Sequence, residues 1–308
     1  MSAPRIAIAP VSEPGLEDAV ASGGGVIAEA EEADGLVWVS PRDPEGLKDV
    51  LGRSPATWVQ LPFAGIESFV RAGAIDPART WTCTKGAYGP ACAEHALALM
   101  LAGARRLANH ARAKKWEEPG FGSPERRLAG ATVLIFGTGG IGRALVPMLQ
   151  PLGVRMLGIS RSGGPVEGIE RTATTDALRD LVGEADYVVI AAALTDETYR
   201  CFDASIFEAM KPSAWLINVA RGGLVDTDAL IAAVEGGAIA GAALDVTDPE
   251  PLPPDHPLWE LDQVLITPHV ANTWDMAVPE LRAMVERNVA HFARNEPLEG
   301  IVDPALGY

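Results

Sequence analysis

The sequence predicts an α/β protein built on parallel sheets, and two observations support that prediction. Short apolar runs alternate with helical segments from the N-terminus onward, an order typical of parallel βαβ units. The runs are residues 5–9, 35–39 and 57–60, and the helical segments between them are 16–22 and 45–51. A second alternating series starts at residue 131 and opens on a GxGxxG pattern. The 308-residue length fits about two domains of ordinary size.

The second series continues the same alternation almost to the C-terminus. Strands are predicted at residues 131–137, 154–160, 186–192, 215–219, 238–246 and 264–267. Two long helices are predicted, one at 91–113, which is rich in Ala and Leu, and one at 277–294. The segment 116–127 is polar, contains Gly and Pro and has no periodicity, so we expect a connection between domains or an arm.

Composition and charge exclude several classes of protein. The chain has 25 Lys and Arg against 41 Asp and Glu, a net charge of −16, so repulsion disfavours nucleic acid and anionic membranes as partners. Its three cysteines form no CxxC pair, which predicts neither a disulfide framework nor a metal site. We find neither a signal peptide nor an apolar stretch that could span a bilayer, and therefore expect a soluble, cytoplasmic protein.

The GxGxxG pattern predicts a dinucleotide-binding turn, because it follows an apolar strand and opens a helix. Its residues are Gly137, Thr138, Gly139, Gly140, Ile141 and Gly142. The first glycine permits a tight turn, the second lets the backbone approach a pyrophosphate, and the third lets helix and strand pack closely. The N–H groups at the start of the helix then face the phosphates. A purely structural turn is the alternative.

The end of the next predicted strand favours NADP(H) over NAD(H). NAD-binding folds usually carry an acidic residue about 20 positions after the glycine turn. Here that place holds Ser160, Arg161 and Ser162, whose hydroxyls and guanidinium suit a 2′-phosphate. NAD(H) stays open, since Arg161 could instead be solvated or stack on adenine.

Three further segments, each after a predicted strand, contain an Arg, a Glu and a His. They are NVARGG at 218–223, ALDVTDPEPL at 243–252 and TPHVA at 267–271. Ligands bind beyond the carboxyl ends of parallel strands, so these side chains could meet there. Together with GAYGPACAEHAL at 86–97, the glycine turn and LTDET at 194–198, these segments make the chain resemble the D-isomer-specific 2-hydroxyacid dehydrogenase family.

The resemblance implies an architecture. Family members have two Rossmann-like domains with parallel sheets, joined by long helices, with a cleft between them. The implied substrate-binding domain is discontinuous, residues 1–95 and 281–308, and the dinucleotide-binding domain is residues 96–280. A homodimer is implied in the same way.

The resemblance also assigns catalytic roles. Arg221 matches the position that binds the substrate carboxylate, Glu250 the partner of the histidine, and His269 the acid/base. A guanidinium can hold a planar carboxylate through two hydrogen bonds, and an imidazolium beside a carboxylate can protonate a carbonyl oxygen as hydride reaches C2. Structural roles remain alternatives: an ion pair for Arg221, a core position for His269, and a solvated turn for Glu250, which lies two residues from Asp248.

Further contacts follow from the same comparison of motifs. Ala64 and Gly65 match a turn whose N–H groups hold the substrate carboxylate. The segment departs from the commoner motif at Phe63 and at Glu67, a position often held by Asp, and in this it resembles the glyoxylate/hydroxypyruvate reductase branch. The Phe63 ring favours a small substrate unless it turns into the core. Trp274 lines the pocket or simply packs. The remaining matches are to cofactor contacts: Ala193, Leu194, Thr198, Val219, Ala220, Arg221, His269 and Asp245, the last at the position that holds the nicotinamide carboxamide.

We therefore expect an NADP-preferring oxidoreductase that acts on a small anionic 2-oxo or 2-hydroxy acid, with glyoxylate or hydroxypyruvate favoured and D-specificity by resemblance. A 3-phosphoglycerate dehydrogenase is an alternative that the short C-terminus disfavours. Formate dehydrogenase is disfavoured because that relative has an amide where Glu250 stands. A non-catalytic dinucleotide-sensing protein is the alternative of another class. Anionic ligands on a chain of charge −16 predict a locally positive cleft.

Overall fold

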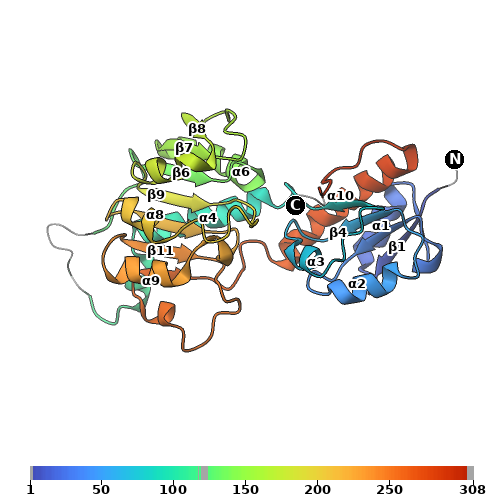
Figure 1. The fold of residues 1–308 in the computed structure, drawn as a ribbon, viewed down its shortest axis with the longest axis horizontal. Coiled ribbons are helices and arrows are strands. Elements are labelled where there is room, and N and C mark those ends of the chain that lie inside the picture. The colour runs from blue at the N-terminus through green and yellow to red at the C-terminus, as the bar shows by residue number, and fades with distance from the viewer. Residues whose placement is uncertain (1–2, 117, 119–123, 304–308) are drawn as a thin grey trace. The chain divides into compact units, whose positions relative to one another are not determined.

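The computed structural model describes residues 3–116, 118 and 124–303, which form two compact units (Figure 1). Unit 1 comprises the chain up to Tyr88 and from Trp274 onward, and unit 2 is Gly89–Thr273. The predicted division after residues 95 and 280 falls inside the two long helices α4 (Gly89–Ala104) and α10 (Trp274–Arg294). Part of the predicted connecting segment 116–127 lies outside the described residues.

Unit 1 is a five-stranded parallel sheet in the order β2-β1-β3-β4-β5. Its strands are β1 (Arg5–Ala9), β2 (Val26–Ile27), β3 (Gly35–Trp38), β4 (Trp58–Leu61) and β5 (Thr80–Cys83). Its other helices are α1 (Pro14–Ser22), η1 (Ala30–Glu32), α2 (Pro44–Leu51) and α3 (Glu67–Arg71). Side chains alternate across the sheet. Ile6 and Val37 therefore pack with α1 and α10, whereas their neighbours Ala7 and Leu36 pack with α2 and α3.

Unit 2 is a seven-stranded parallel sheet in the order β12-β11-β10-β9-β6-β7-β8. Its strands are β6 (Thr132–Phe136), β7 (Arg155–Ile159), β8 (Arg171–Ala173), β9 (Tyr187–Ile190), β10 (Trp215–Asn218), β11 (Gly241–Leu244) and β12 (Val264–Ile266). The strand order reverses between β6 and β9. Such a reversal is where open α/β sheets bind ligands, beyond the carboxyl ends of the strands.

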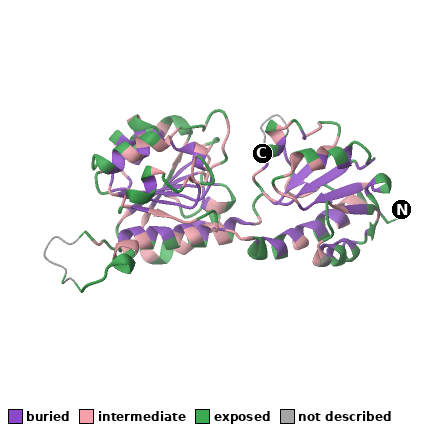
Figure 2. Ribbon diagram, turned by 90° about the horizontal axis from the view of Figure 1, so that it is seen from below, coloured by how far each residue is buried: buried purple, intermediate pink, exposed green. Residues whose placement is uncertain are grey.

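Helices cover both faces of this second sheet. They are α4, α5 (Leu107–Arg112), α6 (Gly140–Leu149), η2 (Gln150–Leu152), η3 (Thr175–Ala177), α7 (Leu178–Val182), α8 (Ala204–Ala209), η4 (Gly222–Leu224), α9 (Thr227–Glu235) and η5 (Pro257–Glu260). Val133 and Ile135 of β6 share a core with α4 and α6, while Leu134 and Phe136 share one with α7, α8 and α9. Strands β6, β9 and β11 are accordingly buried at every residue, and the helices packed against the sheet are exposed on their outer sides (Figure 2). The predicted fold class, α/β with two parallel sheets, is confirmed.

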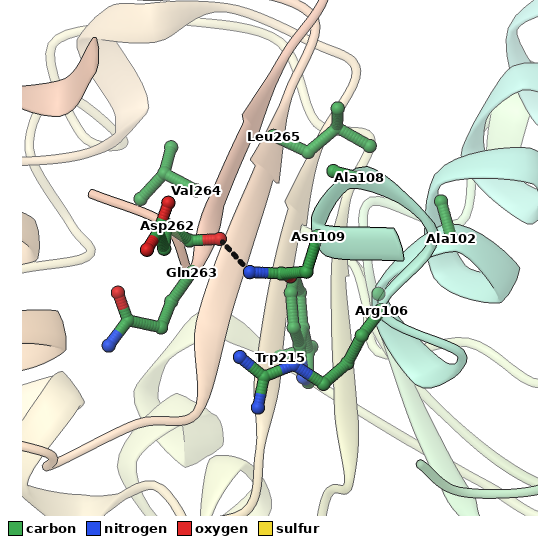
Figure 3. A pocket seen from close by; sticks show the side chains of 10 residues that line it. Ala102, Arg106, Ala108, Asn109, Trp215, Asp262, Gln263, Val264 and Leu265 are labelled. Carbon is green, nitrogen blue, oxygen red and sulfur yellow. Dashed lines mark hydrogen bonds between the residues drawn. The ribbon is translucent and has the colours of Figure 1, made fainter. Parts of the chain in front are cut away.

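The prediction of one continuous helix over 91–113 is wrong. Helix α4 ends at Ala104, and Arg106 adopts a left-handed conformation (φ 48°) before α5 begins. Close packing precedes the break, because a Cβ on Gly103 would lie 2.6 Å from the Trp215 ring. The change of direction lets Asn109 Nδ2 donate to the Asp262 carbonyl oxygen at 3.3 Å (Figure 3). The pocket in Figure 3 lies at the amino ends of β10 and β12, the edge opposite to the predicted catalytic motifs.

Candidate active site

The glycine turn after β6 has the geometry of a dinucleotide-binding loop. Gly137 has φ +103°, and a Cβ there would lie 2.5 Å from the backbone of Ala191 and Ala192, at the end of β9. A Cβ on Gly142 would lie 2.4 Å from the Gly137 carbonyl oxygen, so the third glycine allows α6 to pack on the strand. A Cβ on Gly139 meets nothing within 4 Å. Open space thus lies at the N-terminus of α6, where the backbone can approach a pyrophosphate.

Other predicted cofactor positions lie on loops at the same edge of the sheet. The Ser160 and Ser162 hydroxyl oxygens accept hydrogen bonds from the N–H groups of Gly163 and Gly164, at 3.2 and 3.3 Å, so each hydroxyl proton can still be donated. Arg161 is exposed between them, at the end of β7. No acidic residue occupies residues 160–164, where a carboxylate would hold an NAD ribose.

The loop after β9 contains Ala193, Leu194 and Thr198. The Thr198 hydroxyl donates to the Ala193 carbonyl oxygen at 2.8 Å and accepts from the Thr195 N–H at 2.8 Å. Its hydrogen bonds close this turn, so the hydroxyl acts on the loop itself. The predicted cofactor contacts at these three positions stay predictions.

A buried asparagine fixes the turn that presents Arg221. Asn218, 1% exposed at the end of β10, donates through Nδ2 to the Arg221 carbonyl oxygen at 2.9 Å and accepts from the Ala220 N–H at 3.0 Å. Val219 and Ala220 between them are buried. The Arg221 guanidinium donates to the Ala220 carbonyl oxygen at 2.6 Å. No role was predicted for Asn218, although a polar residue directly after the apolar run WLI could have indicated one.

The turn at Arg221 lies directly against the segment that carries Glu250. A Cβ on Gly222 would lie 2.0 Å from the Thr247 backbone and 2.5 Å from the Asp248 nitrogen. The same segment is anchored by the Thr227 hydroxyl, which donates to the Asp248 carbonyl oxygen at 2.7 Å. Only a glycine allows these two turns to approach so closely.

Glu250 and His269 form a hydrogen-bonded pair. His269 Nδ1 lies 2.8 Å from Glu250 Oε1, and the two side chains are 41% and 32% exposed. Glu250, and not Asp248, is the carboxylate hydrogen-bonded to the ring. His269 adopts φ +55°, and its backbone N–H donates to the carbonyl oxygens of Asp245 and Thr267, at 2.8 and 3.0 Å. An imidazole held at Nδ1 by a carboxylate leaves Nε2 to exchange a proton with a ligand.

Asp245 is a buried acceptor behind that pair. Its carboxylate, 1% exposed, accepts from the Thr267 hydroxyl at 2.6 Å and from the N–H groups of Val270 and Ala271, both at 2.9 Å. Burial by itself raises the pKa of Asp245, but hydrogen bonds from His95, Thr267 and these two amides outweigh it and lower the pKa to about 2. Its predicted contact with a nicotinamide carboxamide stays a prediction.

In unit 1, Phe63 is a half-buried member of an aromatic cluster. Its ring centroid lies 5.6 Å from that of Tyr88 and 5.8 Å from that of Trp274, which is 37% exposed. Contacts of this geometry stabilise aromatic pairs by about 0.5–1.5 kcal/mol. The ring of Phe63 therefore has a defined place next to Ala64 and Gly65.

Two hydroxyl groups fix the start of that loop. The Pro62 carbonyl oxygen accepts from Tyr88 Oη at 2.5 Å and from Thr84 Oγ1 at 2.8 Å. Burial raises the pKa of Tyr88 to about 12, so its hydroxyl remains a donor at neutral pH. Ala64 and Gly65 follow, with Ala64 exposed. Their predicted contacts with a substrate carboxylate are untested by this geometry.

The structure adds two negative findings for residues 3–116, 118 and 124–303. No helix of this part of the chain is long and apolar enough to cross a bilayer. No group of three or more His, Cys, Asp or Glu side chains in it is arranged to hold a metal ion.

Unit 2 thus combines an open α/β sheet, a glycine turn at the reversal of strand order and a His–Glu pair at the same edge, which together define a dinucleotide-dependent enzyme domain. The profile of the D-isomer specific 2-hydroxyacid dehydrogenase family, NAD binding domain, matches residues 97–271. The chain belongs to this family of oxidoreductases.

The similarity to known proteins extends beyond that domain. The chain is 42% identical over 253 residues to an uncharacterized protein of Corynebacterium melassecola, covering 82% of this chain and 83% of the other. It is 37% identical over 234 residues to a glyoxylate reductase of Thermofilum pendens, covering 73% and 67%. A solved D-isomer specific 2-hydroxyacid dehydrogenase of Xanthobacter autotrophicus, in complex with NADPH and MES, is 27% identical with a TM-score of 0.86, covering 99% and 100%.

Proposed function

We propose that this chain is an NADP(H)-preferring, D-specific reductase of small 2-oxo acids, with glyoxylate and hydroxypyruvate as the favoured substrates. The observation that supports it most directly is the His269–Glu250 hydrogen bond of 2.8 Å at the carboxyl edge of the sheet. Similarity to glyoxylate reductases supports the substrate class. The similar Xanthobacter structure contains NADPH.

The residues of this chain divide the proposed chemistry among them. When bound, the reduced nicotinamide supplies hydride to C2 of the acid. Arg221 holds the substrate carboxylate by two parallel hydrogen bonds. His269 Nε2 donates a proton to the carbonyl oxygen as negative charge develops there, and Glu250 stabilises the protonated ring through Nδ1. In the reverse direction, neutral His269 removes the hydroxyl proton.

The glycine turn and the loop after β7 would hold the dinucleotide. The N–H groups of Thr138, Gly139 and Ile141 would meet the pyrophosphate at the N-terminus of α6. Arg161, with the hydroxyls of Ser160 and Ser162, would bind the adenosine 2′-phosphate. Arg161, Arg221 and these N–H groups would attract anionic ligands to a chain whose net charge is −16.

A rate panel tests the proposed function. Oxidation of NADPH and of NADH is followed at the absorbance of the reduced nicotinamide, with glyoxylate, hydroxypyruvate, pyruvate and 3-phosphohydroxypyruvate. We expect turnover with the first two acids and kcat/KM at least tenfold higher with NADPH, a difference of about 1.4 kcal/mol. Arg161→Ala should remove most of that preference and leave the NADH rate unchanged. No oxidation with any acid would contradict the reductase, and a wild-type preference for NADH would contradict the role of Arg161.

Gly139→Ala tests the cofactor site separately from folding. The new methyl group meets nothing within 4 Å, so we expect an unchanged melting temperature. It would occupy the space assigned to the pyrophosphate, and we expect the Kd for NADPH to rise at least tenfold, about 1.4 kcal/mol. Gly52→Ala, where the nearest contacts are an ordinary 3.4 and 3.6 Å, is the matched control and should change neither quantity. Undiminished NADPH binding by Gly139→Ala would show that the turn does not hold the pyrophosphate.

The homodimer is part of the same proposal and rests on family resemblance. Light scattering during size-exclusion chromatography should then give twice the 32.4 kDa mass of the chain.

A further inference from the structure

A second histidine lies close behind the His269–Glu250 pair. His95, in α4, has a side chain 21% exposed. Its Nε2 is 3.0 Å from Thr267 Oγ1 and 3.3 Å from Asp245 Oδ1. Neither His95 nor Thr267 was among the residues that sequence motifs assigned to catalysis or binding. All of these contacts lie within unit 2.

The hydrogen-bond partners of the Thr267 hydroxyl show that His95 Nε2 carries a proton. A threonine hydroxyl has one proton, and Thr267 Oγ1 lies 2.6 Å from Asp245 Oδ1, a distance typical of a hydroxyl that donates to a carboxylate. Thr267 Oγ1 must therefore accept at its other contact. His95 Nε2 is the donor there, so this nitrogen carries a proton whether the ring is neutral or charged.

The groups that His95 contacts are those that fix the turn at His269. The Asp245 carboxylate accepts from the N–H groups of Val270 and Ala271, and the carbonyl oxygens of Asp245 and Thr267 accept from the His269 N–H. His269 itself has φ +55°, a conformation that a non-glycine residue keeps only when its surroundings impose it. The position of the His269 ring therefore depends on where Thr267 and Asp245 are held.

We propose that His95 is a positioning residue for catalysis, which acts on His269 through Thr267 and Asp245. The inference rests on the proposed reductase function and adds a residue to it. His95 anchors the end of β12 to α4, and the turn that follows then keeps His269 Nδ1 on Glu250. Without the donor at Nε2, Thr267 loses its hydrogen bond to α4 and Asp245 loses a polar contact of 3.3 Å, so the turn at His269 is held less firmly. A displacement of the order of 1 Å at a reacting group lowers rates by up to about a hundredfold.

Two substitutions of His95 separate positioning from folding. His95→Leu removes the donor and keeps similar bulk, and we expect kcat with glyoxylate to fall about tenfold to a hundredfold while the Kd for the reduced cofactor changes less than threefold. His95→Gln places an amide N–H near the position of Nε2, and it should restore kcat to within about threefold of the wild type. His110→Leu is the matched control, since His110 is exposed and pairs with Glu125, and it should leave kcat unchanged.

A kinetic isotope effect and a double variant complete the test. Reduced cofactor deuterated at the transferred position should give a larger isotope effect on kcat in His95→Leu, because the chemical step is slowed; loss of folded enzyme would not change it. Thr267→Val should lower kcat similarly, and the double variant should be no slower than the slower single variant, since both act through one contact.

Three outcomes would overturn the inference: wild-type kcat in His95→Leu, no rescue by glutamine, or a rise in cofactor Kd as large as the fall in kcat. The last would place the effect on the cofactor site instead of on His269. Absence of turnover in the wild type would instead contradict the proposed function, so the two failures are distinguishable.

Discussion

Replacement of His269 by alanine should lower kcat for 2-oxo acid reduction by about a thousandfold, the range expected for loss of a general acid. The ring is 41% exposed and its side chain has Glu250 as its hydrogen-bond partner, so little packing is lost with it. The backbone N–H of residue 269 keeps its acceptors in the variant. We therefore expect normal folding and a cofactor Kd within about threefold of wild type.

Glu250→Gln is a milder variant that tests the same proton transfer. Glutamine keeps an oxygen that can accept from Nδ1 and removes the negative charge that stabilises the protonated ring. The loss in kcat should be smaller, about tenfold to a hundredfold. Stopped-flow measurement of a single turnover separates the chemical step from product release. If His269→Ala instead weakens cofactor binding as much as it lowers kcat, the histidine has a structural role.

Much of the fold was predictable because the core follows simple periodicity. Strands buried on both faces, such as β6 with Val133 to Phe136, read as continuous apolar runs between Gly-containing turns. Strands β2, β5 and β8 lack such a run and were not predicted. β2 is two exposed residues at a sheet edge, β8 is Arg171–Ala173 with no fully buried residue, and β5, TWTC, alternates threonine with an apolar residue over only four positions. Their place in the sheet is set by neighbouring strands that local sequence does not reveal.

The break between α4 and α5 was missed for a related reason. Nothing in the run around Gly103 and Arg106 opposes a helix strongly enough to predict an end. The end follows a tertiary contact, the approach of Gly103 to the Trp215 ring. Such a contact joins residues more than a hundred positions apart, and helix propensity carries no information about it.

The candidate site divides in the same way. Motifs pointed to Arg221, Glu250 and His269, and the structure places Glu250 and His269 in direct contact. The residues that hold them, Asn218 and His95, lie inside the matched segments 218–223 and 86–97, but those motifs assigned them no role. Their importance appears only when α4, β10, β11 and β12 are adjacent, since His95 and Thr267 are separated by 172 positions in the chain.

Gly222→Ala should be strongly damaging, although Gly222 is not among the residues proposed to contact ligands. The new Cβ would lie 2.0 Å from the carbonyl carbon and oxygen of Thr247 and 2.5 Å from the Asp248 nitrogen. These are backbone atoms, so no side-chain rotation can relieve the overlap. The turn bearing Arg221 and the segment bearing Glu250 must move apart. We expect unfolding free energy to fall by about 2–3 kcal/mol, as for other overpacked sites.

Gly223→Ala is the matched comparison at the neighbouring position. There the nearest atom is a methyl carbon of Leu194 at 3.2 Å, which a small rotation of that side chain can displace. Its effect on unfolding free energy should stay within about 0.5 kcal/mol. Urea denaturation of both variants measures the difference. The overlap in Gly222→Ala also separates the turns of Arg221 and Glu250. We therefore expect the folded Gly222→Ala enzyme to have a kcat/KM for the acid that is lower by about a hundredfold. Equal stability and equal activity of the two variants would mean that these two turns are not in close contact in solution. That contact would then not be what keeps Arg221 near Glu250.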